Sequence, residues 1–131
     1  MSEIIRGSEF RPWNKLVGKP GDLTDAIVAI ISLATLEFGM RGIYRKSKLY
    51  EIFPRLSKEF PQVLLPYFPG EFSYFLEKAF ELGLELGGQY EVEISREGAK
   101  KYLNWLESEV GKEYVDRLRP IAERLARMVI S

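Results

Sequence analysis

The stretch from Leu23 to Phe38 constrains the fold of this chain more than any other segment. Apolar side chains would cover nearly every face of a helix here, with Gly21 and Asp22 before its start and Gly39 at its stop. A helix that is apolar on every face is buried on every face. Because 131 residues make one domain, we expect this segment to be the central helix, or to meet a second subunit with part of its surface.

A second helix is predicted after Ser47, whose hydroxyl is expected to cap it, and residues 42–44 before it form a short extended piece. Pro54 predicts a kink or a restart, because proline removes one helical hydrogen bond. Phe60-Pro61 predicts the end of this helix. Residues 61–70 contain three prolines and a glycine, so we expect no regular structure there, although half of them are apolar.

A third helix is predicted from Gly70 to Leu82, with a buried stripe at spacings of three and four that consists of Phe72, Phe75, Leu76, Ala79 and Phe80. Residues 84–94 then alternate around Gly87-Gly88, which indicates a β-hairpin. Ser95 is expected to cap a fourth helix. The first, third and fourth helices should share one core, formed by Ile27, Ile30, Ile31, Phe72, Phe75, Leu76, Leu103 and Leu106.

The last helical stretch follows Gly111, and Pro120 leaves open whether it is one helix or two short ones. Its apolar residues have the spacing of a coiled-coil seam: Tyr114, Leu118, Ile121, Leu125 and Met128. We expect this seam to need a partner surface and therefore predict a homodimer. The outward faces should carry two ion pairs, Glu113–Arg117 and Glu123–Arg127.

The order helix, short strand, helix, helix, β-hairpin, helix resembles a winged helix-turn-helix domain of prokaryotic regulators. The likeness is sharpest in FLEKAFELGLEL, residues 75–86, and YEVEISREGAKKYL, residues 90–103. It implies a mainly α fold with a small β-hairpin, in which residues 23–110 form the winged-helix domain. Residues 111–131 look like the C-terminal dimerisation helix of such regulators. Residues 1–22 are an N-terminal arm, which packs on the domain or, less favoured, reaches across a dimer.

The resemblance implies binding of double-stranded DNA and regulation of transcription, with the third helix in the major groove and the wing on the phosphate backbone. The implied recognition-helix face is Ser73, Tyr74, Glu77 and Lys78. Charge opposes this, because the third helix and the wing are both net negative. The basic residues lie earlier, and the candidate DNA phosphate contacts are Arg41, Arg45, Lys46, Ser47 and Lys48. We weigh phosphate contact and a merely solvated face about equally.

The alternative function is a protein–protein interaction module that does not bind DNA. Its site would be an acidic face beside the aromatic side chains of Tyr67, Phe68 and Tyr74, a composition that suits a protein interface. The same carboxylates, in pairs such as Glu77 and Glu81, are more simply a solvated face than an acid–base pair or an oxygen-rich metal site.

Cysteine and histidine are both absent from the chain, and Lys plus Arg balance Asp plus Glu at 19 each. The absence of both residues excludes thiolate nucleophiles, Cys/His zinc sites and imidazole bases. We therefore expect no catalytic residues, no metal and no cofactor, and an enzyme is the least favoured class. The sequence shows no signal peptide or membrane span, which predicts a cytoplasmic protein with no membrane partner. Few Asn and Gln residues hint at a thermophile.

Overall fold

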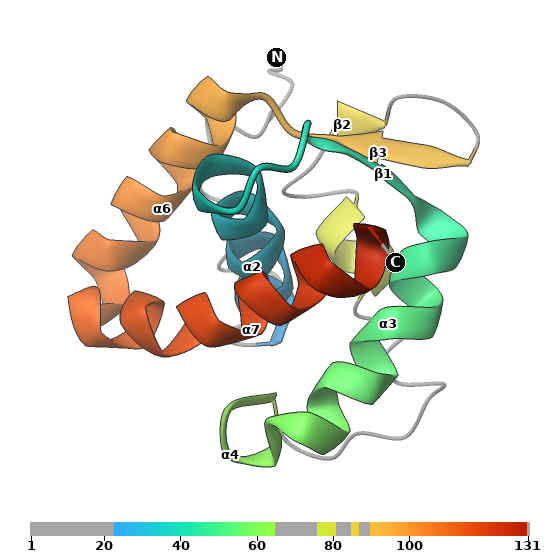
Figure 1. Cartoon of the computed structure of the whole chain (residues 1–131). Coiled ribbons are helices and arrows are strands. Elements are labelled where there is room, and N and C mark those ends of the chain that lie inside the picture. The colour runs from blue at the N-terminus through green and yellow to red at the C-terminus, as the bar shows by residue number, and fades with distance from the viewer. Residues whose placement is uncertain (1–22, 65–75, 81–84, 87–89, 131) are drawn as a thin grey trace.

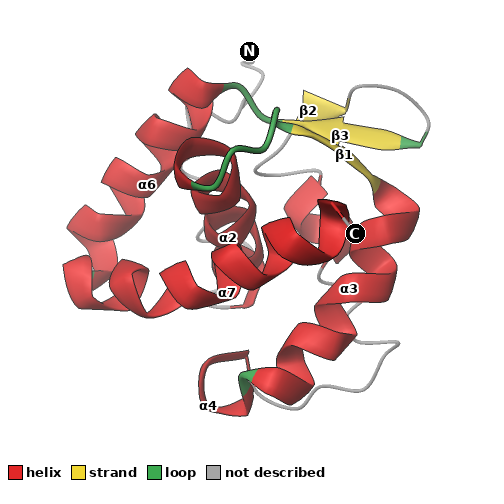
Figure 2. Ribbon diagram, viewed as in Figure 1, coloured by secondary structure: helices red, strands yellow, loops and turns green. Residues whose placement is uncertain are grey.

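The computed structural model describes residues 23–64, 76–80, 85–86 and 90–130 (Figure 1). Helix α2 (Leu23–Glu37) lies at the centre, and its main packing partners are α6 (Arg96–Val110) and α7 (Lys112–Ile130). Every residue from Leu23 to Thr35 is buried, which confirms the expectation of a central helix. Most of the described residues are helical, and a small antiparallel sheet lies at one edge, as Figure 2 shows.

The sheet has three antiparallel strands, β1 (Ile43–Arg45), β2 (Glu85–Leu86) and β3 (Glu91–Glu93), in the order β1-β3-β2. The β2–β3 pair confirms the predicted hairpin. The pairing of β1 with β3 was not predicted, because the partner of a short extended segment cannot be read from its own residues. Tyr44 pairs with Val92 and both are buried, so this strand pair fastens the sheet to the helices.

Helix α3 (Lys46–Glu59) corrects the expected cap and excludes one of the two alternatives predicted at Pro54, a kink or a restart. Ser47 is not the cap: the N-cap is Arg45, which makes no side-chain cap hydrogen bond, and Ser47 lies exposed in the first turn. The reason is that β1 runs straight into the helix, and the Lys46 amide already donates to the Tyr90 carbonyl at 2.9 Å. The helix also does not restart at Pro54. Buried neighbours on the same helix, such as Phe53, offset the lost hydrogen bond.

The end of α3 follows prediction, whereas the next residues do not. The helix ends at Glu59 with Phe60 as its C-cap. Residues 61–64 then form a short helix, α4 (Pro61–Leu64), where we expected no regular structure. Pro61 suits a first helical turn because its φ angle is preset and that position needs no amide donor. The amides of Val63 and Leu64 both donate to the Phe60 carbonyl, at 3.1 and 3.0 Å.

The predicted core is confirmed wherever it is described. Ile27, Ile30, Ile31, Leu76, Leu103 and Leu106 belong to one buried cluster, whereas Phe72 and Phe75 lie outside the described residues. Residues 76–80 are helical, and Ala79 and Phe80 are buried with Leu76. Ser95 caps α6 as predicted, since its hydroxyl accepts a hydrogen bond from the Gly98 amide at 2.8 Å. The N-terminal arm, residues 1–22, also lies outside the described residues.

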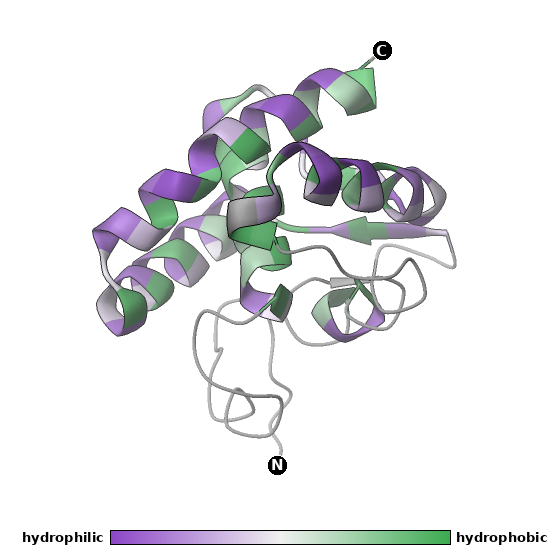
Figure 3. Cartoon of the chain, turned by 90° about the horizontal axis from the view of Figure 1, so that it is seen from below, coloured by the Kyte–Doolittle hydropathy of each residue, from purple (hydrophilic) through white to green (hydrophobic). Residues whose placement is uncertain are grey.

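Helix α7 is a single helix through Pro120, and its seam does not face outward. Leu118, Ile121 and Leu125 are fully buried, and α7 packs against α2, α3 and α6 of its own chain. In Figure 3 the helices around α2 alternate hydrophilic and hydrophobic residues, as expected when one face packs inward. The expectation that this seam needs a second copy was wrong, because the all-round apolar α2 offers α7 a face of its own.

The two ion pairs predicted on α7 have different outcomes. Arg127 and Glu123 form an ion pair at 2.9 Å. Glu113 and Arg117 do not pair within the described structure; the Arg117 guanidinium lies 5.9 Å from the centre of the Tyr114 ring. The homodimer itself stays a prediction. Among the helices described, none is both long and apolar enough to cross a membrane.

Two buried polar contacts in the core were not predicted. The Tyr102 hydroxyl on α6 donates a hydrogen bond to the carboxylate of Asp25, which is fully buried in the first turn of α2. The Thr35 and Tyr44 hydroxyls are hydrogen-bonded to each other at 2.8 Å. Buried polar groups need such partners, because leaving a donor or an acceptor without one costs about 1–3 kcal/mol. Both contacts therefore fix how α2 is rotated against its neighbours.

Burial raises the pKa of Tyr44 from its ordinary value of 10.0 to about 12. Folding stability linked to this phenol is complete below pH 10 and is lost as the pH rises to about 12, since only the unfolded chain ionises in that interval. We expect the ionisation of Tyr44 to lower the free energy of unfolding by about 2–3 kcal/mol between these two pH values. Urea titrations at each pH would measure it. The Tyr44→Phe variant should lose this component, whereas Tyr90→Phe, at a side chain 71% exposed, should keep it.

Candidate functional site

Four of the five candidate phosphate-binding residues come together where β1 meets α3: Arg45 is the last residue of β1, and Lys46, Ser47 and Lys48 form the first turn of α3. Arg41 precedes the other end of β1. Arg41, Arg45 and Ser47 are exposed, whereas Lys46 and Lys48 are half-buried. We call these five residues the β1–α3 basic cluster. The junction of β1 and α3 lies at the edge of the sheet in Figure 1.

A surface hollow of about 490 Å³ lies at this cluster. Its polar lining includes Arg45, Ser47, Lys48 and Glu51, and its apolar lining includes Ile43 and Val129. Arg41 and Lys46 do not line it, and the Lys46 ammonium lies 5.7 Å from the centre of the Phe80 ring. The structure thus groups three of the five predicted residues around one hollow.

The four cations of the cluster make no ion pair within the described residues. None of Arg41, Arg45, Lys46 and Lys48 has a carboxylate oxygen within 4 Å there; the ion pairs involve Arg119, Arg124 and Arg127 of α7. Arg45 lies opposite Glu91 in the β1–β3 register, but the two side chains do not form an ion pair. No described carboxylate therefore neutralises the positive charge of the cluster.

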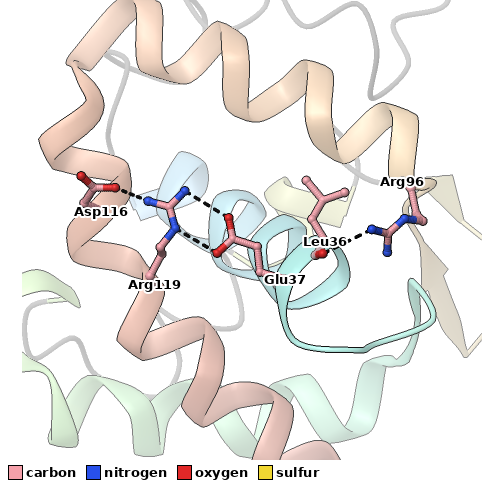
Figure 4. Close-up of polar contacts among 5 residues, drawn as sticks. All are labelled: Leu36, Glu37, Arg96, Asp116 and Arg119. Atoms are coloured by element: carbon pink, nitrogen blue, oxygen red, sulfur yellow. Dashed lines mark hydrogen bonds and ion pairs between the residues drawn. The ribbon is translucent and has the colours of Figure 1, made fainter.

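By contrast, the arginines of α7 are structural. Arg119 binds both carboxylate oxygens of Glu37 at the end of α2, at 2.9 and 3.1 Å, and also pairs with Asp116 (Figure 4). Arg124 likewise donates to both carboxylate oxygens of Glu59 at the end of α3, at 2.9 and 3.2 Å. The hydrogen bond that Glu59 accepts from Arg124 lowers the pKa of Glu59, and the hydrogen bond that Arg119 donates to Glu37 raises the pKa of Arg119. No sequence signal pointed to these pairs, since their partners are 82 and 65 residues apart.

The acidic elements expected to oppose DNA remain acidic where they are described. On β3, Glu91 and Glu93 are half-buried, and Glu93 is the backbone partner of Glu85. On the predicted recognition helix, Glu77 is exposed and Lys78 is half-buried. The other candidates on that face, Ser73 and Tyr74, lie outside the described residues, as do Tyr67 and Phe68 of the alternative protein-binding site.

Among the described residues, no group of three or more Asp and Glu side chains is placed to hold a metal ion. Of the paired carboxylates considered from sequence, Glu81 lies outside the described residues. The described site is therefore a cationic surface with a hydroxyl and an adjacent apolar patch, which can bind an anion but offers no acid–base pair.

No family model matches the chain, and neither a curated protein nor a solved structure matches it.

Proposed function

We propose that this protein is a DNA-associated winged-helix protein, a regulator of transcription that contacts the duplex backbone through the β1–α3 basic cluster. The observation that carries the proposal is a group of three cations, Arg45, Lys46 and Lys48, at one strand-to-helix junction, with Arg41 before the other end of β1. None of the four has a carboxylate partner among the described residues. Phosphate contacts supply most of the affinity of proteins for DNA, and arginine and lysine are their usual donors.

The fold supports this proposal through its order of elements. A helix, a strand, a helix, the helical residues 76–80, a hairpin and a further helix follow one another as in the winged helix-turn-helix pattern. The strand β1 joins the hairpin in one sheet, so the start of α3 is held beside β3. The first-turn amides of α3 add a partial positive charge at the same place as the cations.

The charge of the remaining elements sets the character of the binding. Glu77, Glu91 and Glu93 would repel a duplex that approached the third helix or the wing. The proposed contacts are therefore to the backbone, and recognition of base sequence is weak. Such binding depends strongly on salt, because each neutralised phosphate releases condensed counterions.

The test measures binding of a mixed-sequence duplex by fluorescence anisotropy over a series of salt concentrations. The double variant Arg45→Ala/Lys46→Ala should weaken binding to all duplexes about equally and reduce the log–log salt slope by roughly one per lost phosphate contact. The matched control is Lys112→Ala/Arg117→Ala, which removes the same charge from exposed positions at the start of α7. The proposal fails if the wild type does not bind duplex at low salt, or if both variants bind alike.

Neutralising the opposing carboxylates should have the reverse effect. The variant Glu77→Gln/Glu81→Gln should bind duplex more tightly than the wild type, because two charges that repel phosphate are removed. The same anisotropy titration measures this. Unchanged or weaker binding would mean that the predicted recognition helix lies away from the duplex.

A second candidate function, a protein-interaction module, is favoured by a different observation. Ile43 and Tyr90 are 50% and 71% exposed, and they lie beside Glu91 and Glu93 on the sheet. Exposed apolar and aromatic side chains next to carboxylates suit a protein surface better than a duplex. If the wild type binds no duplex, this sheet edge becomes the site to test, with Tyr90→Ser expected to abolish binding of a partner.

A further inference from the structure

A second basic surface lies on α6, in a hollow of about 390 Å³ between this helix and the end of α2. Its lining consists of Leu36 on α2 and of Arg96, Glu97, Lys100, Lys101 and Asn104 on α6. Three cations thus face one carboxylate, so the hollow attracts anions.

The cations of this hollow differ in their contacts: Arg96 binds backbone carbonyls, whereas Lys100 and Lys101 make no ion pair within the described residues. Arg96 already has partners where α2 ends: its guanidinium donates to the Thr35 carbonyl at 2.9 Å. It also donates to the Leu36 carbonyl at 3.3 Å (Figure 4). It satisfies backbone acceptors that have no helical partner and offsets the partial negative charge at the helix end. Lys100 and Lys101 are exposed and have no carboxylate oxygen within 4 Å among the described residues.

The sheet ties this surface to the β1–α3 basic cluster. The Ile94 amide, just before α6, donates to the Gly42 carbonyl at 2.8 Å, and the Lys46 amide donates to the Tyr90 carbonyl at 2.9 Å. These two hydrogen bonds are four residue steps apart along each strand, which corresponds to about 13 Å. In Figure 1 the strand pair runs from the start of α6 to the start of α3, with Arg41 in the loop that enters β1.

A DNA strand rises by about 3.4 Å per nucleotide, so the length of this strand pair corresponds to roughly four nucleotides. Arg41 precedes the end of β1 that is bonded to Ile94, and Lys100 and Lys101 lie in the second turn of the helix that follows Ile94. Arg41 is therefore the cation of the β1–α3 basic cluster that lies toward α6. The strand pair holds the starts of α3 and α6 in place, so binding at one need not order the other.

We propose that Lys100 and Lys101 form a second phosphate-contacting surface for the same DNA duplex, which extends the footprint from α3 across β1 to α6. This inference rests on the proposed function. It assigns to the helix after the hairpin a direct part in binding the nucleic-acid backbone, in addition to its packing against α2.

The experiment uses the full chain and a mixed-sequence duplex. The variant Lys100→Gln/Lys101→Gln should lower the log–log salt slope by roughly two, since each lost phosphate contact lowers it by about one. Glutamine keeps the helix propensity of lysine, so the thermal midpoint should not change. The matched control, Lys58→Gln/Lys112→Gln, removes the same charge from exposed positions at the end of α3 and the start of α7. Its slope should equal that of the wild type.

The outcomes separate this inference from the proposed function. If Arg45→Ala/Lys46→Ala weakens binding while Lys100→Gln/Lys101→Gln behaves like its control, the β1–α3 basic cluster binds DNA without α6 and the inference is overturned. If the wild type binds no duplex at low salt, both are overturned. A reduced slope only in the α6 variant and in the Arg45→Ala/Lys46→Ala variant supports both.

Discussion

Replacing Gly42 by alanine is expected to lower the free energy of unfolding by about 2–4 kcal/mol. Gly42 has a φ angle of +88°, a region that residues with a Cβ atom rarely adopt. An added Cβ would also overlap the carbonyl oxygen of Ile94. This oxygen cannot shift without disturbing the hydrogen bond from the Ile94 amide to the Gly42 carbonyl. The substitution therefore strains the start of β1 and loosens its pairing with β3.

The control for this prediction is Gly39→Ala. Gly39 has a similar φ angle of +79°, but no atom lies within 4 Å of the position where its Cβ would be. Only the cost of the positive φ angle applies there, which is about 1–2 kcal/mol. Urea unfolding, with comparison of midpoints at a constant slope, measures both. Equal losses at the two glycines would mean that the contact with Ile94 does not constrain the chain.

The variant Ile31→Ala should cost about 2–4 kcal/mol of unfolding free energy. Ile31 is fully buried in α2 at the centre of the core, so the removed methyl groups leave a cavity that surrounding helices fill only in part. Ile31→Val should cost about 0.5–1.5 kcal/mol, because it removes a single methylene. The matched control is Ile130→Ala, at a side chain that is 74% exposed.

Urea unfolding monitored by circular dichroism measures this series. The control should stay within about 0.5 kcal/mol of the wild type, as is usual for surface substitutions. A loss below about 1 kcal/mol for Ile31→Ala would show that α2 is not the packed centre of the molecule. The ordered series of alanine, valine and control also distinguishes a cavity effect from a change in helix propensity, since alanine is the better helix former.

The proposed DNA site and the folded core use arginine in different ways. Arg119 and Arg124 are held by Glu37 and Glu59 in bidentate pairs that join α7 to the ends of α2 and α3. Arg45 has no such pair with any described carboxylate, although Glu91 lies opposite it in the sheet. Sequence alone does not separate these two uses, because it does not show whether an arginine side chain meets a carboxylate from a distant part of the chain.

The sequence by itself determined the local elements and the residues they bury. The boundaries of α2, the hairpin, the Ser95 cap and the buried stripe with Leu76 and Phe80 all followed from periodicity and from residues that start or stop helices. These features depend on side chains within a few positions of one another, so their physical cause is present in the sequence. Residues 61–64 and Ser47 were exceptions: the former are helical, and at Ser47 the distant carbonyl of Tyr90 accepts the hydrogen bond from the first amide of α3.

Only the tertiary structure decided which surfaces these elements cover. The seam of α7 looked like a dimer interface because its spacing is the same whether it packs on a second copy or on α2. The buried bond between Tyr102 and Asp25 and the placement of Lys100 beside the end of α2 likewise join residues far apart in the chain. Such contacts depend on how helices pack in three dimensions, and periodicity along one helix carries no information about its partner.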